Sequence, residues 1–181
     1  MSRSQLLVLA AIVFIVSQAM AQKPPPAVDS ARAKLQFLAG RFTTEVSMPP
    51  GPGMPKGATG KGTSLIVWAL DSAFLMIDEQ SINSLLGNYK GHGMLYFDPN
   101  VQQYMLTMYN NFGDHPSYKG DFFGDTLVLL TKVPMPGHPF DQKLLWYKDG
   151  GTVKLKVMND IGKGFALALE QTATPVTGKA K

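Results

Sequence analysis

Hydrophobic and polar residues alternate along most of the chain that follows Gly40. The alternation is clean at 153–157, where lysines separate Val, Leu and Val, and at 165–170, where Phe and two leucines alternate with Ala, Ala and Glu. A period of two residues is typical of a strand with one buried face. Strand-like segments bounded by Gly, Pro, Asn or Asp occupy 42–48, 62–70, 73–82, 89–97, 102–111, 117–123, 125–133, 141–148, 152–159 and 164–174.

A helical period occurs only before these segments. Its apolar positions are Val28, Ala31, Leu35 and Leu38. Asp29 stands where an N-cap belongs and Gly40 is a stop signal, so we predict one short helix over about 30–38. A run of about ten strands with no crossover helix favours an all-β fold, an up-and-down antiparallel barrel with a short N-terminal helix plugging one end.

The connections between the predicted strands fall into two groups when strands simply alternate in direction. One end of the barrel collects tight turns at 71–72, 98–100, 124 and 149–151. The other end collects longer loops at 49–57, 83–87, 113–116, 134–139 and 160–163. The helix precedes the first strand and therefore enters at the tight-turn end. We expect the long-loop end to be the open mouth, where barrels hold ligands.

The N-terminal residues have the features of a secretory signal peptide. These are Arg3, an apolar run at 6–16 and the small residues Ala19 and Ala21. The apolar run is short for a bilayer, so we predict no stable membrane anchor. We therefore expect a secreted or periplasmic protein with a signal peptide at 1–21, a Pro-rich tether at 22–28, a single barrel domain at 29–175 and a disordered tail at 176–181.

Composition narrows the function classes. The chain of 181 residues has a formal net charge of +4 and no cysteine. Its lysines are scattered rather than clustered, which argues against a nucleic-acid partner. The Gly57–Ser64 segment lacks phosphate-loop spacing, and neither a G-x-S-x-G nor an H-E-x-x-H motif occurs. No cofactor is predicted.

Several glycines and turn residues resemble those of the bacterial secreted proteins of domain-of-unknown-function family 1579. They are Gly91, Gly93, Asp98, Tyr104, Gly120, Gly124 and Leu127. The resemblance covers about 35–174 and implies a calycin-like barrel, related in shape to lipocalins and the haem-binding nitrobindins, with no activity attached. Tyr109 and Asn111 occupy the positions at which the family has a W-x-D motif. The chain has no His after His138, so no haem ligand is implied.

Asp78 and Glu79 form the carboxylate pair of most interest. They are neighbours within a strand, so one of them should point into the barrel. A carboxylate in the lumen is costly unless it is paired or hydrogen-bonded. Pairing with Lys90 or a tyrosine hydroxyl is the simpler interpretation, and a group that orients a ligand or acts as an acid or base is the alternative.

Aromatic residues on the strands supply the other candidates for a ligand site. The full set is Trp68, Asp78, Glu79, Tyr96, Tyr104, Tyr109 and Trp146. The main hypothesis is a barrel that binds a small apolar ligand in its lumen. The alternatives are a packed barrel that acts as a structural or interaction module, and an enzyme that uses a lumen carboxylate. The sequence leaves the oligomeric state open, a homodimer included.

The segment "GHG" at 91–93 raises a narrower question. Gly91 and Gly93 share one face of a strand, and His92 lies on the other. We expect the two glycines to admit a neighbouring side chain, such as Trp68 or Trp146, and His92 to be a hydrogen-bonded strand residue rather than a ligand.

Metal binding has three candidate residues, His115, His138 and Met135, all in the predicted mouth loops. Histidine and methionine suit copper. Both histidines precede a proline, which is ordinary turn composition, so we predict no metal site.

Overall fold

The computed structural model describes residues 26–51, 54–85, 87–135 and 137–176. The chain divides into two units, Met1–Ser30 and Ala31–Lys181, and the second contains the barrel. Helix α2 spans Pro26–Lys34 and continues into a 3-10 turn, η1, at Leu35–Leu38. The predicted signal peptide and the first residues of the predicted tether lie outside the described residues.

The helix begins earlier than the sequence pattern indicated. We predicted Pro26–Val28 as part of an extended tether and a helix start near Ser30, but these residues form the first turn of α2. Proline suits this position because the first amides of a helix have no intrahelical acceptor. Asp29 is therefore a first-turn residue, where its negative charge favours the helix dipole, rather than the N-cap.

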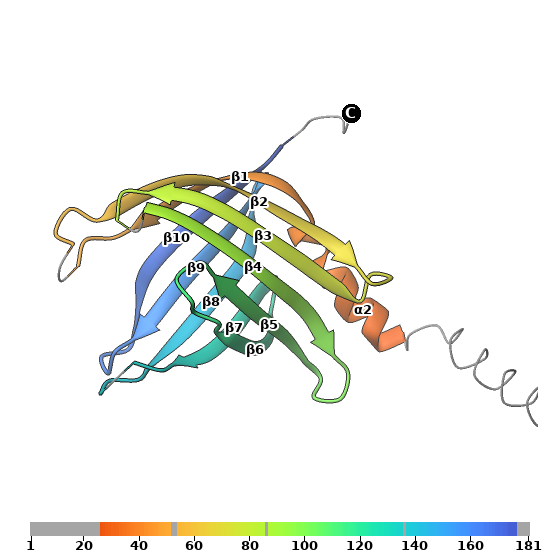
Figure 1. Ribbon diagram of the computed structural model, residues 1–181. Coiled ribbons are helices and arrows are strands. Elements are labelled where there is room, and N and C mark those ends of the chain that lie inside the picture. Colours follow the sequence, from red (N-terminus) through yellow and green to blue (C-terminus); the bar gives the residue numbers. More distant parts are fainter. Residues whose placement is uncertain (1–25, 52–53, 86, 136, 177–181) are drawn as a thin grey trace, which may run out of the picture. The chain divides into compact units, whose positions relative to one another are not determined.

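Ten strands form a closed barrel in which each strand pairs antiparallel with its sequence neighbours and the first pairs with the last. This confirms the predicted up-and-down barrel (Figure 1). The strands are β1 (Gly40–Met48), β2 (Ala58–Ala69), β3 (Phe74–Asn83), β4 (Gly87–Asp98), β5 (Gln103–Asn110), β6 (Ser117–Phe123), β7 (Thr126–Val133), β8 (Phe140–Asp149), β9 (Thr152–Asp160) and β10 (Phe165–Pro175).

Strand β10 departs from the predicted alternation. Leu167 pairs with Met158 and Leu169 with Val157, so Ala168 is the extra residue of a bulge. The bulge reverses the faces, and Leu167 is exposed while Leu169 lines the lumen. The prediction that Phe165, Leu167 and Leu169 share one buried face was therefore wrong.

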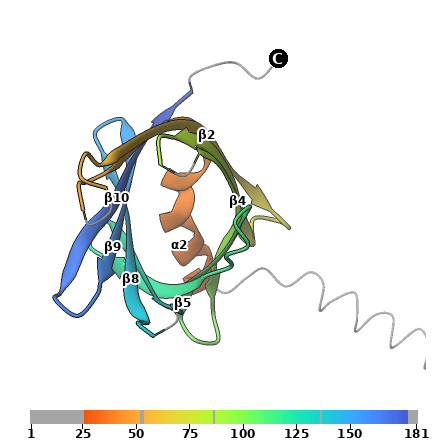
Figure 2. The ribbon, with the colours of Figure 1, turned by 60° about the vertical axis from the view of Figure 1, so that its left-hand side comes forward.

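The hydrophobic core fills the tight-turn half of the barrel. Ala31, Leu35 and Leu38 close this end, packed with inward residues of the strands. Figure 2 shows the strands closing into a ring. The fully buried strand residues are Leu75, Ile77, Leu95, Tyr104, Leu106, Leu127 and Leu129. The Tyr104 hydroxyl donates a hydrogen bond of 2.9 Å to the Ala31 carbonyl oxygen, and the Trp68 indole N–H donates one of 2.9 Å to Gln36.

The glycines of β4 face the lumen and, as predicted, leave room for neighbouring side chains, but these side chains differ from those we expected. A β-carbon on Gly93 would collide with the Met108 sulfur, and one on Gly91 would meet the Tyr89 ring. Met108 and Tyr89 therefore occupy the space that we had assigned to Trp68 or Trp146.

Strand pairing confirms which connections share an end of the barrel. Those of β2–β3, β4–β5, β6–β7 and β8–β9 lie at the end closed by Ala31–Leu38, and the other five lie at the opposite end, called the mouth below. The predicted difference in length holds only in part, because the mouth connections at 84–86 and 161–164 are no longer than the turns at 70–73 and 99–102. None of the described helices is long and apolar enough to cross a membrane.

Candidate functional site

A cavity of about 790 Å³ occupies the mouth half of the lumen. Its apolar wall is formed by Val46, Ile77, Leu106, Met108, Leu144, Trp146, Leu155, Val157 and Leu169. Residues at the loop end, including Asp114, His115 and Pro134, line it where it opens to solvent. The structural-module alternative required a lumen packed along its whole length, and this cavity shows that the lumen is not.

Glu79 is the enclosed carboxylate of this cavity. It projects inward from β3, in register with Ser64 on β2 and Gly91 on β4. Its surface is partly accessible, but only to space within the lumen, and protein atoms surround it. Burial raises the pKa of Glu79, and its hydrogen bond with the Gln171 side chain partly offsets the rise.

Glycines on β2 leave room for this contact between β3 and β10. The inward positions of β2 next to Ser64 are Gly60 and Gly62, which pair with Val46 and Thr44 of β1. Gly62 has no side chain, and a β-carbon there would collide with the backbone of β3. No side chain of β2 therefore stands at this position between Glu79 on β3 and Gln171 on β10.

Two buried hydroxyls on β1 and β2 have no hydrogen-bond partner among the residues that the structure describes. They belong to Thr44, which lines the cavity, and Ser64, which pairs with Glu79 in register. Their residues are 2% and 3% exposed. The two oxygen atoms have almost no accessible surface of their own, so they lie within the barrel wall rather than open to the cavity.

Tyrosines continue the polar lining around the lumen. Burial raises the pKa of Tyr89, and the nearby Glu79, Tyr118 and Asp114 raise it further. Burial, with a smaller effect of Asp114, raises the pKa of Tyr118 to about 12. Both phenols therefore remain neutral hydrogen-bond donors at neutral pH.

Amides complete this lining on the opposite wall. Tyr118 donates a hydrogen bond of 2.5 Å to the Gln142 side-chain oxygen, and the Gln142 amide donates one of 2.9 Å to Asn159. We call Glu79, Tyr89, Tyr118, Gln142 and Gln171 the lumen polar cluster. It combines hydrogen-bond donors and acceptors with one carboxyl group, inside an otherwise apolar wall.

The carboxylate pair of β3 is split between the two faces, as its spacing predicted. Glu79 lies inside, whereas Asp78 lies outside and forms a 2.7 Å contact with His92 Nδ1. Both outer side chains are about half exposed. His92 is thus a hydrogen-bonded strand residue, and Asp78 takes no part in the cavity.

The predicted aromatic residues are not brought together. Trp146 lines the cavity. Tyr104 and Trp68 lie at the closed end, bonded to Ala31 and Gln36. Tyr109 is 55% exposed, and Tyr96 lies outside, with its ring centroid 5.2 Å from that of Phe74. Of the seven predicted site residues, only Glu79 and Trp146 therefore line the cavity.

The three candidates for metal binding do not converge. His115 lines the mouth of the cavity, whereas Met135 and His138 are exposed on another loop and do not line it. No group of three or more His, Cys, Asp or Glu side chains suited to a metal ion occurs in the described ranges.

Sequence reasoning missed Tyr89, Tyr118, Gln142 and Gln171. A signal for each was present, because each lies two residues from another inward position. Tyr89 shares the face of Gly91, and Gln142 shares that of Leu144. The residues predicted from the sequence are aromatic residues and carboxylates from both faces of their strands, and inward polar residues such as glutamine are not among them.

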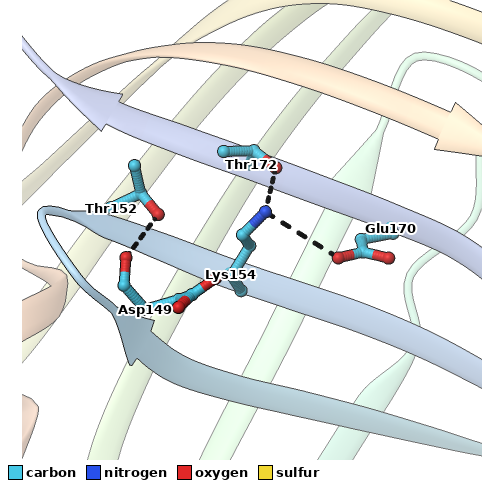
Figure 3. Close-up of polar contacts among 5 residues, drawn as sticks. All are labelled: Asp149, Thr152, Lys154, Glu170 and Thr172. Carbon is cyan, nitrogen blue, oxygen red and sulfur yellow. Dashed lines mark hydrogen bonds and ion pairs between the residues drawn. The ribbon is translucent and has the colours of Figure 1, made fainter.

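A second hollow lies on the outer surface, over β1, β2, β9 and β10. Figure 3 shows its central contacts, in which Lys154 Nζ lies 2.8 Å from Thr172 Oγ1 and 3.9 Å from Glu170. On β1 and β2, Glu45 pairs with Lys61 at 3.3 Å. These charges are mutually paired, so the hollow resembles an ordinary solvated barrel face.

Comparison of the chain with protein-family models found no match, and comparison with curated proteins found none either.

Proposed function

We propose that the protein is a carrier or sensor that binds a small, largely apolar molecule in its lumen. The observation that supports this proposal is the cavity of about 790 Å³, which is walled by apolar side chains, including that of Trp146, and is open at the mouth. Ligand pockets typically measure about 300–1,000 Å³ and combine apolar walls with a few polar groups. The lumen polar cluster supplies such groups.

We further propose that the protein does this outside the cytoplasm, as a calycin-like member of the family that its glycines resemble. The support is the signal-peptide pattern that ends at Ala21. N-terminal sequencing of the exported protein should give Gln22 as the first residue. An intact Met1 on exported protein would overturn this proposal.

Ligand binding is tested with a panel of environment-sensitive apolar dyes. We expect saturable binding with a dissociation constant on the order of micromolar. Trp146 lines the cavity and Trp68 does not, so binding should change the fluorescence of a Trp68→Phe variant but not of Trp146→Phe.

Native mass spectrometry of protein purified from its own compartment identifies the natural ligand. A retained small molecule supports the proposal. Absence of saturable binding across the panel, with the fold intact by thermal melting, would overturn it.

A further inference from the structure

We propose that the lumen selects amphiphiles that carry an ammonium group, with Glu79 as the carboxylate that pairs with it. This inference rests on the proposed function and adds the chemical class of the ligand. It depends on which charges face the cavity and how far each of them is enclosed.

No cationic side chain faces Glu79 from the described strands around it. Its neighbours across the wall and the lumen are Thr44 on β1, Ser64 on β2, Tyr89 on β4, Tyr118 on β6 and Gln171 on β10. Asp114, which acts on both tyrosines, adds a negative charge toward the mouth.

The basic residues of the cavity lining lie in solvent. Lys132 has a side chain that is 68% exposed and lies 3.9 Å from Asp141. His115 is exposed at the mouth. Neither provides an enclosed positive charge, so a ligand carboxylate in the lumen would meet Glu79 and Asp114 without a cation to pair with.

A ligand with an ammonium group would instead bring a positive charge to the negatively charged lumen. A buried carboxylate is stabilised by an opposite charge within a few ångströms, and the lumen itself provides none. The ammonium has three N–H donors, which suit the Glu79 carboxylate in the cavity wall. Aromatic faces such as those of Tyr89 and Tyr118 also attract cations. The apolar wall then accepts the hydrocarbon part.

Three probes of equal chain length separate charge from apolarity: dodecylamine, dodecanol and dodecanoate, each kept below its critical micelle concentration. They compete against a bound dye in the full mature chain. We expect dodecylamine to bind at least about tenfold more tightly than dodecanol, because a charged hydrogen bond exceeds a neutral one by roughly that factor. Dodecanoate should bind most weakly.

The variant Glu79→Gln should bind dodecanol as the wild type does and lose the preference for dodecylamine. Glu45→Gln is the matched control, because Glu45 is an exposed glutamate on the outer face. Its probe affinities should not change. For the wild type, dodecylamine affinity should rise with pH through the titration of Glu79, while dodecanol affinity stays constant.

Two outcomes would overturn the inference and are distinguishable from failure of the proposed function. If dodecanol binds as tightly as dodecylamine, or if Glu79→Gln keeps the preference, the lumen binds apolar molecules without selecting amines. If neither probe nor dye binds saturably while thermal melts show folded protein, the proposed function itself fails.

Discussion

The sulfur of Met108 occupies the space beside Gly93 in which a β-carbon would lie. The two residues are cross-strand partners on β4 and β5, and both face the lumen. The Thr107 carbonyl oxygen lies 3.1 Å from the same position, so the backbone of β5 also limits the space. Gly93 therefore leaves the space that the large Met108 side chain of the neighbouring strand β5 occupies.

Gly93→Val should destabilise the fold by about 1–3 kcal/mol, because the added side chain overpacks the Met108 site. The higher strand propensity of valine offsets part of this cost. Chemical denaturation measures the free energy of unfolding. His92→Ala is the control on the opposite face, and loss of its exposed contact with Asp78 should cost at most about 1 kcal/mol. Equal stability of Gly93→Val and the wild type would refute this account.

Gly120→Ala should be more damaging than Gly93→Ala. The obstacle at Gly120 is the Val128 carbonyl group of the paired strand β7, whereas the main obstacle at Gly93 is a flexible methionine. Backbone cannot move aside without disturbing the ladder between β6 and β7. Gly151→Ala is the control, because a β-carbon there meets nothing within 4 Å. Thermal melts of the three variants should rank Gly120→Ala lowest and place Gly151→Ala near the wild type.

Tyr104→Phe should cost about 1 kcal/mol, the net contribution of one neutral hydrogen bond. Tyr104 is 1% exposed, and its hydroxyl donates to the Ala31 carbonyl oxygen at 2.9 Å. Phenylalanine keeps the ring contacts but removes the hydrogen bond that joins the helix to β5. Tyr109→Phe, on the exposed outer face, serves as the control and should leave the denaturation midpoint unchanged. A midpoint for Tyr104→Phe that matches the wild type would show that water replaces the hydroxyl.

The strand pattern predicted the barrel because each half-buried strand must alternate apolar and polar residues. Val153, Leu155 and Val157 face inward while the lysines between them face out, so ten such segments define the wall. The bulge at Ala168 escaped prediction because the apolar residues of that strand alternate without interruption in the sequence. Phe165 lies outside, where Lys143 Nζ covers its ring at 3.9 Å, and no period distinguishes such a residue from a core residue.

The candidate site was less predictable, because it depends on depth along the barrel as well as on face. Tyr104 and Tyr118 both face inward, yet Tyr104 packs in the closed half while Tyr118 lines the cavity. Their depth depends on strand tilt and register, which sequence periodicity does not contain. The approach of Glu79 to Gln171 across the glycines of β2 joins residues on strands at opposite ends of the sequence, and only the closed pairing of β1 with β10 creates it.

Glu79→Gln should stabilise the unliganded protein increasingly as pH rises. Burial raises the pKa of Glu79 in the folded state above the ordinary value of 4.5, so between these two values the native protein binds more protons than the unfolded chain. Stability contributed by the protonated carboxyl is present below 4.5 and is lost as pH rises through the folded pKa. Glutamine has the shape of the neutral acid and does not titrate. Thermal melts from acid to neutral pH should therefore show the melting temperature of Glu79→Gln moving progressively above that of the wild type. Glu45→Gln, which removes an exposed carboxylate paired with Lys61, should show no such upward trend. A difference between Glu79→Gln and the wild type that stays constant with pH would mean that the lumen solvates the carboxylate fully.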